Sequence, residues 1–526
     1  MTPRLRGYVD VLVVGGGNAG FCAAISAAES GAKRVVIIDS CPEDWVGGNS
    51  YFTAGAFRIA HDGLTDLLPI VNNVDQATAK KIDMAPYTAT HFMNDIQRVT
   101  SGRTDPKLSQ TLVRESNAAI KWLARHGIRF QLSFNRQAYE VNGRIQFWGG
   151  LALKTDNGGK GLIEDHRKAA QRLGIEVYFS HTASALDADP VTNAVRGVEI
   201  ILPNGEKERF KTGAVILAAG GFEANPRMRA QYLGPNWDVA KVRGTPYNQG
   251  GCLELAMRDV SAKQAGNWSG CHSVAWDANA PAHEGDRAIS NEFTKSGYPM
   301  GIMVNRNGER FVDEGVDMRN YTYAIFGKAI LAQPGSFAFQ IWDSQTIPWL
   351  RAEEYRDGIV EKITASTLSE LADKCAERGL ASRDRLLNTI EEFNDAVEQH
   401  RKENPGVTWN PAVKDGLSTQ SRTSRLPLAK SNWATTISKG PFLAVRVTCG
   451  VTFTFGGLAV DPETAAVVST TNKTVPNLYC VGEMLGGIFY DNYPGGSGLT
   501  SGAVFGRRAG KAAAAKAASS LAVARL

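Results

Sequence analysis

Glycines at positions 15, 17 and 20 and an aspartate at position 39 have the spacing of a dinucleotide-binding motif. Gly15 would permit a tight turn, and Gly17 would let backbone N–H groups approach a pyrophosphate at a helix N-terminus. Gly20 would let that helix pack closely on a sheet. Asp39 follows about twenty residues later and could accept hydrogen bonds from a ribose.

The elements that must position these residues are readable on either side of them. Residues 9–14 predict a buried parallel strand, residues 21–30 a helix of small residues, and residues 34–39 a second strand with an acidic end. A G-x-G-x-x-G triplet alone is a weak signal. The complete strand–turn–helix–strand unit is what predicts dinucleotide binding.

Further glycine-rich segments favour a cofactor longer than NAD. Residues 46–56 follow the acidic strand directly, where an NAD-binding fold would continue with another helix and strand, although alone they could be a flexible loop. Residues 214–222 predict a buried strand ending in Gly-Gly, and residues 477–483 predict a strand ending in Glu483. Residues 493–503 then predict a glycine turn that opens a helix, whose N-terminus could hold the negative charge of a reduced flavin ring.

Together these segments resemble the FAD-dependent succinate dehydrogenase/fumarate reductase flavoprotein family over nearly the whole chain. The matching motifs are GGGNAG at 15–20, GGNS at 47–50, AAGGF at 218–222, VGE at 481–483 and GGSGL at 495–499. The resemblance implies an α/β fold with a discontinuous Rossmann-like FAD-binding domain at residues 1–242 and 446–526. An α+β capping domain would be inserted at residues 243–445, with the substrate between cap and flavin and hydride passing to or from flavin N5.

The resemblance also implies a set of cofactor-binding residues. They are Gly15, Gly17, Asn18, Ala19, Gly20, Asp39, Ser40, Gly47, Gly48, Asn49, Ser50, Gly55, Ala56, Ala183, Ala219, Gly220, Glu483, Ser497, Gly498 and Leu499. Members that bind flavin covalently carry a histidine after the second glycine pair. Here Asn49 stands after Gly48, so we expect non-covalent FAD.

The middle of the chain has a different pattern of predicted secondary structure. Residues 301–312 predict a hairpin with an Asn-Gly turn. Residues 367–400 predict two helices separated near Gly379, and their apolar residues at steps of three and four are interpreted as core. The domain junctions would fall near residues 241–246 and 440–445. The segment from Gly510 to Ala524 reads as a helix or a frayed tail.

The segment from Asn305 to Glu314 is similar to the family's cap signature N-x-x-G-x-R-F-V-x-E, which implies that Arg319 is the proton shuttle. Because the pKa of a free guanidinium exceeds 12, that role needs burial and a relay. Asp313, Glu314 and Asp317 are the candidate relay groups.

Other assignments stay open at this point. Arg319 could instead be an ordinary ion pair, and Tyr321 or Tyr323 could transfer the proton. His272 stands where the family places a substrate-binding histidine, but a lone histidine is equally compatible with a structural role.

Two departures from the fumarate reductase pattern concern the substrate. Phe453 stands where those enzymes have a histidine, and Tyr493 stands where they have a carboxylate-gripping arginine. A buried carboxylate without such partners is unfavourable by several kcal/mol or so, which disfavours fumarate and succinate.

Two branches of the family remain. The runs GGNS, RGTPYN, CHSVAWD and NYPGGSGL resemble FAD-dependent tricarballylate dehydrogenases, which oxidise a tricarboxylate to cis-aconitate. Arg58, Arg243 and Arg319 could then supply positive charge. The Tyr-Pro-Gly segment also resembles 3-ketosteroid Δ1-dehydrogenases, which use tyrosines to polarise a ketone and take a proton.

The expected reaction is dehydrogenation of a CH–CH bond beside a carboxylate or carbonyl, or the reverse enoate reduction. Arg319 or a nearby tyrosine such as Tyr321 would move the proton, and His272 and Tyr493 would hold the activating oxygen. Partners would be a small-molecule substrate and an electron acceptor: a quinone, oxygen or a separate redox protein. A non-catalytic flavin-binding protein is the alternative of another class. A flavin hydroxylase fits less well, since it would carry a later Gly-Asp strand end.

The amino-acid composition excludes several classes of protein. The 526 residues are 43% hydrophobic and 21% charged with a net charge of +5, which excludes a disordered chain and argues against nucleic-acid binding. No apolar run approaches a membrane span, and the seven cysteines contain no C-x-x-C, so no metal site, haem site or disulfide scaffold is expected. The N-terminal residues leave no room for a secretory signal. We therefore expect a cytoplasmic protein, or a peroxisomal one if Ala524-Arg525-Leu526 acts as a variant S-K-L signal.

Overall fold

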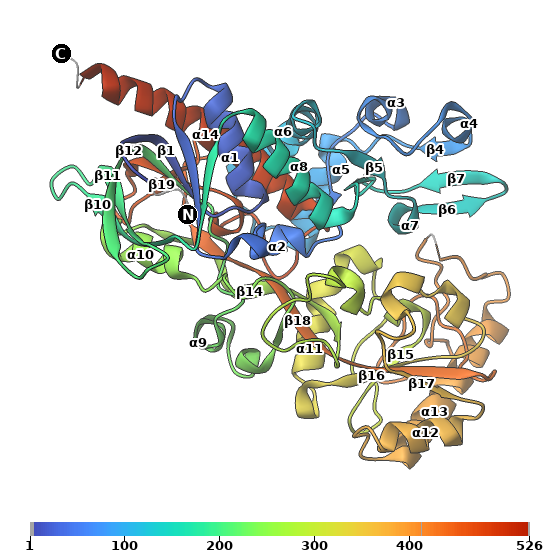
Figure 1. Cartoon of the computed structure of the whole chain (residues 1–526). Coiled ribbons are helices and arrows are strands. Elements are labelled where there is room, and N and C mark those ends of the chain that lie inside the picture. The colour runs from blue at the N-terminus through green and yellow to red at the C-terminus, as the bar shows by residue number, and fades with distance from the viewer. Residues whose placement is uncertain (1–4, 412, 524–526) are drawn as a thin grey trace. The chain divides into compact units, whose positions relative to one another are not determined.

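The computed structural model describes residues 5–411 and 413–523, which form two compact units (Figure 1). Unit 1 takes in the chain up to Gly234, then Gly244–Cys271 and the segment from Phe453 onward. Unit 2 consists of Pro235–Arg243 and His272–Thr452.

Unit 1 is built on a parallel sheet whose central strands are apolar throughout. In the order β20-β12-β1-β2-β9, neighbouring strands run parallel; Val11 of β1, for example, pairs with Ala214 of β12 and with Val35 of β2. Every residue of β1 is buried, as a strand covered on both faces requires. The strands are β1 (Val9–Val14), β2 (Val35–Asp39), β9 (Glu176–Phe179), β12 (Lys207–Leu217) and β20 (Thr474–Cys480).

Antiparallel strands extend this sheet. β10 (Thr182–Ala188) pairs with β11 (Val195–Ile201), which pairs with β12, while β19 (Ala466–Val468) pairs with β20. The other elements of unit 1 are α2 (Gly48–Tyr51), β3 (Ala56–Phe57), α3 (Leu64–Leu67), α4 (Gln76–Ala79), β4 (Ile82–Met84), α5 (Ala89–Val99), α6 (Pro106–Arg125), β5 (Phe130–Leu132), α7 (Phe134–Gln137), β6 (Ala138–Val141), β7 (Arg144–Phe147), β8 (Leu153–Thr155), α8 (Gly158–Arg172), α9 (Pro226–Met228) and α10 (Gly251–Val260).

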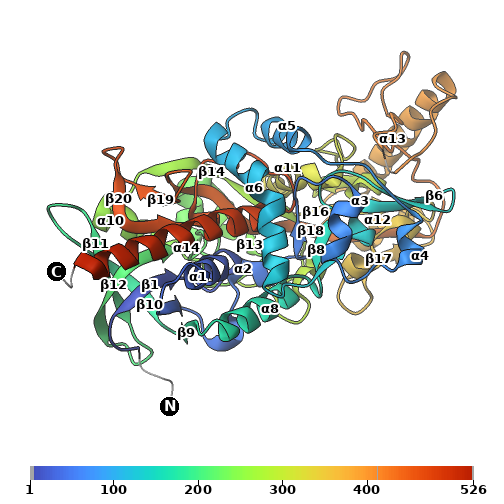
Figure 2. The same cartoon turned by 90° about the horizontal axis from the view of Figure 1, so that it is seen from above.

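Helices α1 (Asn18–Glu29) and α14 (Ser497–Val523) lie side by side through small residues (Figure 2). Three glycines at four-residue intervals on α14 face α1. A Cβ at Gly506 would lie 2.8 Å from the Ala19 carbonyl oxygen, and one at Gly510 would lie 2.3 Å from that of Ala23. The segment after Gly510, expected as a helix or a frayed tail, therefore continues as a helix to Val523.

Unit 2 contains a sheet in the order β13-β18-β16-β15, with β14 and β17 also paired to β18. Strands β14 and β18 each have one end in unit 1. The elements are β13 (Lys241–Val242), β14 (Gln264–Asp277), β15 (Ile302–Asn305), α11 (Tyr323–Leu331), β16 (Ala338–Trp342), β17 (Lys362–Ala365), α12 (Leu368–Ala376), α13 (Arg383–Glu403) and β18 (Phe442–Leu458).

The helical pair predicted for residues 367–400 is confirmed. Helices α12 and α13 are separated near Gly379, and their apolar stripe packs on the sheet of unit 2. Leu371, Ile390 and Phe393 are buried in the same cluster as Phe339 of β16. The interpretation of this stripe as core packing is therefore correct.

The hairpin predicted for residues 301–312 forms only in part. Its turn is present, because the Gly308 N–H donates to the Asn305 carbonyl at 3.0 Å, but the second arm makes a single bridge, between Val304 and Arg310. The Glu314 carboxylate accepts the Met303 N–H at 2.8 Å, the donor that a longer second arm would have used. β15 finds its regular partner in β16 instead.

Residues 244–271 belong to unit 1, whereas the sequence boundaries placed them in the inserted segment. Helix α10 packs on β10, where the Asp259 carboxylate accepts the Leu186 N–H at 2.8 Å. Long-range packing of this kind has no signal in the local composition that set the predicted boundary.

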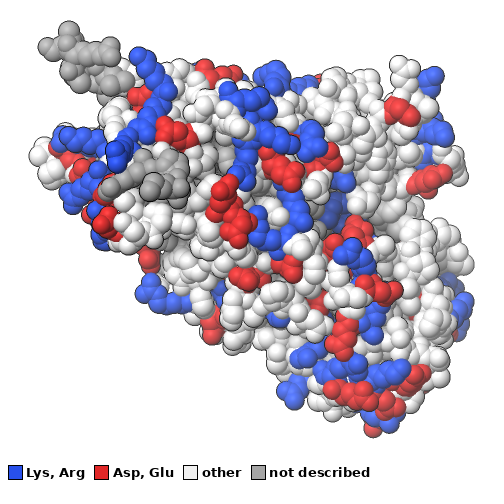
Figure 3. All heavy atoms as spheres, in the orientation of Figure 1, with Lys and Arg blue, Asp and Glu red and all other residues white. Residues whose placement is uncertain are grey.

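On the face shown in Figure 3, Lys and Arg alternate with Asp and Glu. Among the described residues, no helix is both long and apolar enough to cross a membrane. The predicted C-terminal signal Ala524-Arg525-Leu526 lies outside the described residues.

Gly510→Ala should destabilise the protein by about 1–3 kcal/mol, because its methyl group would collide with the backbone of α1. Gly251→Ala is the matched control: it lies at the start of α10 with no atom near its Cβ position, so it should change stability by less than about 0.5 kcal/mol. Chemical unfolding of the two variants measures both values. Equal stabilities would contradict the close approach of α14 to α1.

Candidate functional site

The glycine turn after β1 is closely packed and braced by Asp39. A Cβ at Gly15, whose φ is +112°, would lie 2.3 Å from the Ala218 carbonyl oxygen, and one at Gly20 would lie 1.9 Å from that of Gly15. The Asp39 carboxylate accepts the Gly16 N–H at 2.7 Å, a contact that the sequence motif does not reveal. Its proposed hydrogen bonds to a ribose stay a prediction.

Gly17 differs from Gly15 and Gly20 in having room around it. A Cβ there would meet only the Gly47 carbonyl at 3.7 Å and Ser50 Oγ at 3.8 Å. Gly17 is the N-cap of α1 and has no side chain with which to cap the helix, while Ser50 Oγ accepts the N–H of the first helical residue, Asn18. The other N–H groups of the first turn and the partial positive charge of a helix N-terminus are the donor set that a pyrophosphate requires, so these residues fit FAD.

Asn18 joins three of the predicted cofactor segments. Its N–H donates to Ser50 Oγ at 3.1 Å, and its side-chain amide donates to the Leu499 carbonyl at 2.9 Å. The structure therefore brings the first glycine turn, the loop at 47–51 and the start of α14 together within unit 1.

His166 is a member of this assembly that the sequence did not indicate. Its Nε2 lies 3.0 Å from Asn18 Oδ1, and its ring stacks on Phe21. Burial, with a smaller contribution from His126, lowers the pKa of His166 to about 3, so the ring is neutral at pH 7. The surrounding sequence on α8 carries no motif that would have found it.

Asn49, Gly220 and Glu483 meet around a second residue that the sequence did not indicate, Glu223. The Asn49 side-chain amide donates to the Glu223 carboxyl group, and Gly220, at a φ of +73°, leaves no room for a Cβ beside Asn248. Glu483 accepts the Thr454 N–H at 2.7 Å.

The remaining predicted cofactor residues lie within unit 1 at varied distances from these contacts. Gly55 accepts the Thr155 N–H at 2.8 Å, where β3 pairs with β8, and the Ala219 N–H lies 3.2 Å from Met484 Sδ. Ser497 Oγ donates to the Pro494 carbonyl at 2.6 Å at the start of α14. The others are Ala19 on α1, Ser40 after β2, Gly47 and Gly48 at the start of α2, Ala56 on β3, Ala183 on β10 and Gly498 on α14.

Three of the four predicted catalytic residues belong to unit 2. His272 is buried on β14, with its ring centroid 5.7 Å from that of Tyr323. Burial and then the positive charge of Arg243 hold the pKa of His272 well below its ordinary range, so the imidazole is neutral at pH 7. Arg319 and Tyr321 share one turn of 3-10 helix, Arg319–Tyr321.

The Arg319 turn is anchored through Thr322. The Thr322 hydroxyl donates to the Arg319 carbonyl at 3.1 Å and lies 2.8 Å from the Tyr298 hydroxyl. Burial raises the pKa of Tyr298, and the charge of Arg319 opposes that rise. Arg319 therefore acts electrostatically on a buried phenol of its own unit.

Tyr493, the fourth predicted catalytic residue, belongs to an aromatic cluster of unit 1. Its ring centroid lies 5.0 Å from that of Phe453, 5.5 Å from Phe489 and 6.4 Å from Phe455. Both positions at which the sequence departs from fumarate reductases thus fall in one apolar cluster.

Two of the three arginines proposed to supply positive charge, Arg58 and Arg243, donate hydrogen bonds to other side chains of the protein. Arg58 is fully buried, and its guanidinium donates to the Tyr87 hydroxyl at 2.9 Å and to the Asp95 carboxylate at 3.1 Å. Arg243 Nη1 donates to the Thr452 hydroxyl at 3.0 Å.

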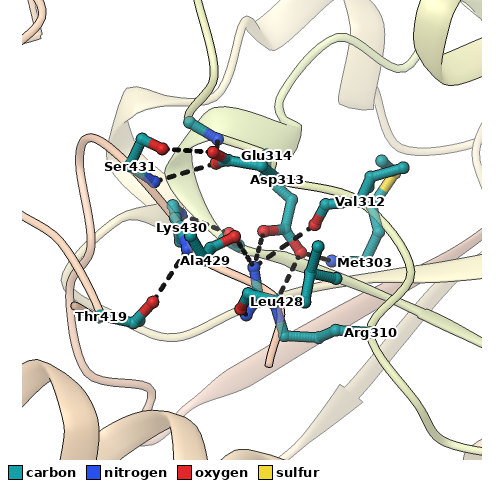
Figure 4. Close-up of polar contacts among 12 residues, drawn as sticks. Met303, Arg310, Val312, Asp313, Glu314, Thr419, Leu428, Ala429, Lys430 and Ser431 are labelled. Carbon is teal, nitrogen blue, oxygen red and sulfur yellow. Dashed lines mark hydrogen bonds and ion pairs between the residues drawn. The ribbon is translucent and has the colours of Figure 1, made fainter. Parts of the chain in front are cut away.

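Two of the three candidate relay acids hold the chain of unit 2 together (Figure 4). Arg310 forms a buried ion pair with Glu314 and donates to the Leu428 and Ala429 carbonyls. Asp313 accepts hydrogen bonds from the Ser431 N–H and hydroxyl. These contacts explain the R-x-x-x-E part of the cap signature as a structural clamp.

The third candidate relay acid, Asp317, lies two residues before Arg319. Its carboxylate accepts the Met318 N–H at 2.8 Å. Its part in a proton relay stays a prediction.

A sequence model of the FAD binding domain family matches residues 10–499. The chain is 28% identical over 509 residues to a fumarate reductase (cytochrome) of Shewanella frigidimarina, covering 96% of this chain and 77% of the relative. It is 26% identical over 536 residues to a vinyl phenol reductase of Lactiplantibacillus plantarum, covering 98% of each. The crystal structure of 3-ketosteroid Δ1-dehydrogenase from Sterolibacterium denitrificans has the same fold, with a TM-score of 0.72 at 19% identity over 97% of this chain and all of that one.

Substitutions of Gly15 and Gly17 should have different effects, one on stability and the other on FAD binding. Gly17→Ala should leave the stability of the protein without cofactor within about 1 kcal/mol of wild type, since its methyl group finds room, but should weaken FAD binding. Gly15→Ala should destabilise the fold itself by several kcal/mol or so, because both its φ and its contacts exclude a side chain. Thermal unfolding and FAD titration separate the two effects. Normal FAD affinity in Gly17→Ala would contradict the assignment of this turn.

Proposed function

The chain belongs to the FAD-binding family of the succinate dehydrogenase/fumarate reductase flavoproteins, and we propose on this basis that it is an FAD-dependent oxidoreductase acting on a CH–CH bond. The bond would lie next to a carboxylate or a carbonyl group. One observation carries the proposal: the family match extends through both units, and in unit 1 it includes a helix N-terminus whose N–H groups could bind a pyrophosphate. FAD, when bound, supplies or accepts the hydride.

The chain's own residues would handle the proton and the activating oxygen. Arg319, or Tyr321 in the same helical turn, would take the proton from the carbon beside the activating group. His272, held neutral by burial, and Tyr493 would donate hydrogen bonds to the activating oxygen, where negative charge develops. Operated in reverse, the same groups would protonate an enoate during reduction.

Two observations favour different substrate classes. The sequence resemblance favours a tricarboxylate, and the aromatic cluster favours a cyclic ketone. The rings of Phe453, Phe455, Phe489 and Tyr493 form an apolar surface, beside which a carboxylate without a cationic partner would be unfavourable by several kcal/mol or so. The same surface favours an apolar ring system, and the Tyr493 hydroxyl would reach its carbonyl. This observation favours a 3-ketosteroid-like substrate as the second candidate.

The electron acceptor and the cellular location are also proposals. A quinone, oxygen or a separate redox protein would take the electrons in the oxidative direction. Cytoplasmic location remains the expectation, with a peroxisomal address as its alternative.

Purified protein should carry flavin absorbance, and denaturation should release the flavin because the cofactor is expected to be non-covalent. Under anaerobic conditions, one of the two candidate substrates should bleach the visible bands: tricarballylate if the sequence resemblance gives the substrate class, or a saturated 3-ketosteroid if the aromatic cluster does. Bleaching by tricarballylate alone would select the tricarboxylate branch. Reoxidation of chemically reduced flavin by an unsaturated acid, without bleaching by any saturated compound, would identify a reductase. Failure to bind FAD at all would overturn the proposed function.

Arg319→Lys should lower kcat by about 10²–10⁴-fold, because a flexible ammonium lacks the planar, multi-donor geometry that would hold the guanidinium at the reacting carbon. Its flavin spectrum and thermal stability should stay unchanged. Arg422→Lys, at a side chain that is 88% exposed, is the control and should be fully active. If Tyr321→Phe is inactive while Arg319→Lys retains activity, the proton-transfer group is Tyr321.

A further inference from the structure

Glu223 and Glu483 form a buried pair of carboxyl groups inside unit 1. Glu223 is fully buried, and its carboxyl group hydrogen-bonds to that of Glu483. The close packing extends to the backbone, since a Cβ at Gly221 would lie 2.1 Å from both Glu483 Oε1 and the Thr454 hydroxyl. A side chain at position 221 would therefore displace Glu483.

The groups around the pair do not compensate two negative charges. Asn49 and Asn248 donate their side-chain amides to Glu223 Oε1, and Thr454 donates its N–H and hydroxyl to Glu483. Arg229 is also in contact, but its guanidinium donates to the main-chain carbonyl of Glu223 and not to the carboxyl group.

Two carboxylates in direct contact within a low-dielectric interior cannot both be ionised, so the pair must hold one proton. Glu223 Oε2 receives no hydrogen bond from any donor in the described part of the protein. That oxygen is the one placed to carry the proton and donate it to Glu483. Burial, followed by the charge of Glu483, raises the pKa of Glu223 well above its ordinary range, in agreement with the geometry.

The pair is directly connected to the candidate cofactor loop. Asn49, which donates to Glu223, also accepts the Thr245 N–H at 2.9 Å through its Oδ1, so both ends of its amide are oriented. Its neighbour Ser50 accepts the Asn18 N–H at the start of α1. Glu483 is itself one of the residues assigned to FAD by the family resemblance.

We propose that Glu223 is a positioning residue of the cofactor site: it keeps the single proton of a buried carboxyl pair and thereby fixes Asn49 and Glu483 for FAD. Loss of this proton would leave two adjacent negative charges and displace both residues. FAD would then bind more weakly as the pH rises. The inference rests on FAD binding and not on the identity of the substrate.

The sign of the pH dependence follows from the proton count. The unfolded chain loses the Glu223 proton near pH 4.3, at about the ordinary pKa of glutamate, whereas the folded protein keeps it to a higher pH. The folded state thus holds more protons, and stability falls as the pH rises from that value to the folded pKa of Glu223. If only the protonated pair binds FAD, affinity falls by up to about tenfold for each pH unit above that pKa.

The test uses Glu223→Gln in the full chain. The glutamine amide can still donate to Glu483 and accept from Asn49 and Asn248, but it cannot ionise. Wild-type FAD affinity, measured by flavin fluorescence between pH 6 and pH 10, should weaken with rising pH, whereas Glu223→Gln should bind with one affinity throughout, within about threefold of the wild-type value at low pH. Thermal unfolding without FAD should show the same contrast.

Glu483→Gln provides the second variant: it removes the neighbouring negative charge, so the pKa of Glu223 should fall and the pH dependence should move to lower pH. Glu115→Gln, in the same unit but paired with Arg508, is the matched control and should keep the wild-type dependence. An infrared band of a protonated carboxyl group, present in wild type and lost in Glu223→Gln, reports the proton directly. The proposal is overturned if Glu223→Gln keeps the wild-type pH dependence, or if wild type binds FAD with one affinity over the whole range. Failure of every substrate in the bleaching assay would leave these readouts unaffected.

Discussion

The N-terminus of α1, whose N-cap Gly17 has no side chain, is the constraint around which unit 1 is built. Asp39 holds the turn before this helix by accepting the Gly16 N–H. Gly15 and Gly20 bring the turn and helix against the sheet, and Asn18 connects the segment at 47–51 and the start of α14 to the same point. The cofactor segments, separated by hundreds of residues in sequence, converge because they must surround one helix end.

The two units solve the burial of charge in different ways. In unit 2, Glu314 forms an ion pair with Arg310, which also donates to carbonyls of the segment at 428–429. Breaking such a pair from one side is unfavourable by about 3–5 kcal/mol, which is reason enough for the motif without a catalytic role. In unit 1, Glu223 and Glu483 are compensated by a shared proton. The second arrangement makes the proposed cofactor site responsive to pH.

The proposed roles of His272 and Tyr493 are each supported by the surroundings of the side chain. A histidine whose pKa is lowered by burial is a hydrogen-bond donor at pH 7 and not a cation, so it suits a developing oxyanion better than a resident carboxylate. The ring cluster at Phe453 and Tyr493 has the same preference. If both residues have the proposed roles, a substrate activated by a carbonyl oxygen is favoured.

The amino-acid sequence by itself determined the elements whose stability is local or strongly patterned. The β1–turn–α1–β2 unit, the helical pair at 367–400 and the meeting of glycine-rich segments at the start of α1 were all predictable, because the periodicity of apolar residues and the conformational needs of glycine leave few alternatives. Only the tertiary structure decided the incomplete hairpin, the clamp role of Asp313 and Glu314, and the parts played by His166 and Glu223. Each of these features depends on which buried hydrogen-bond donor pairs with which acceptor far away in the sequence. The local sequence does not indicate such long-range pairs.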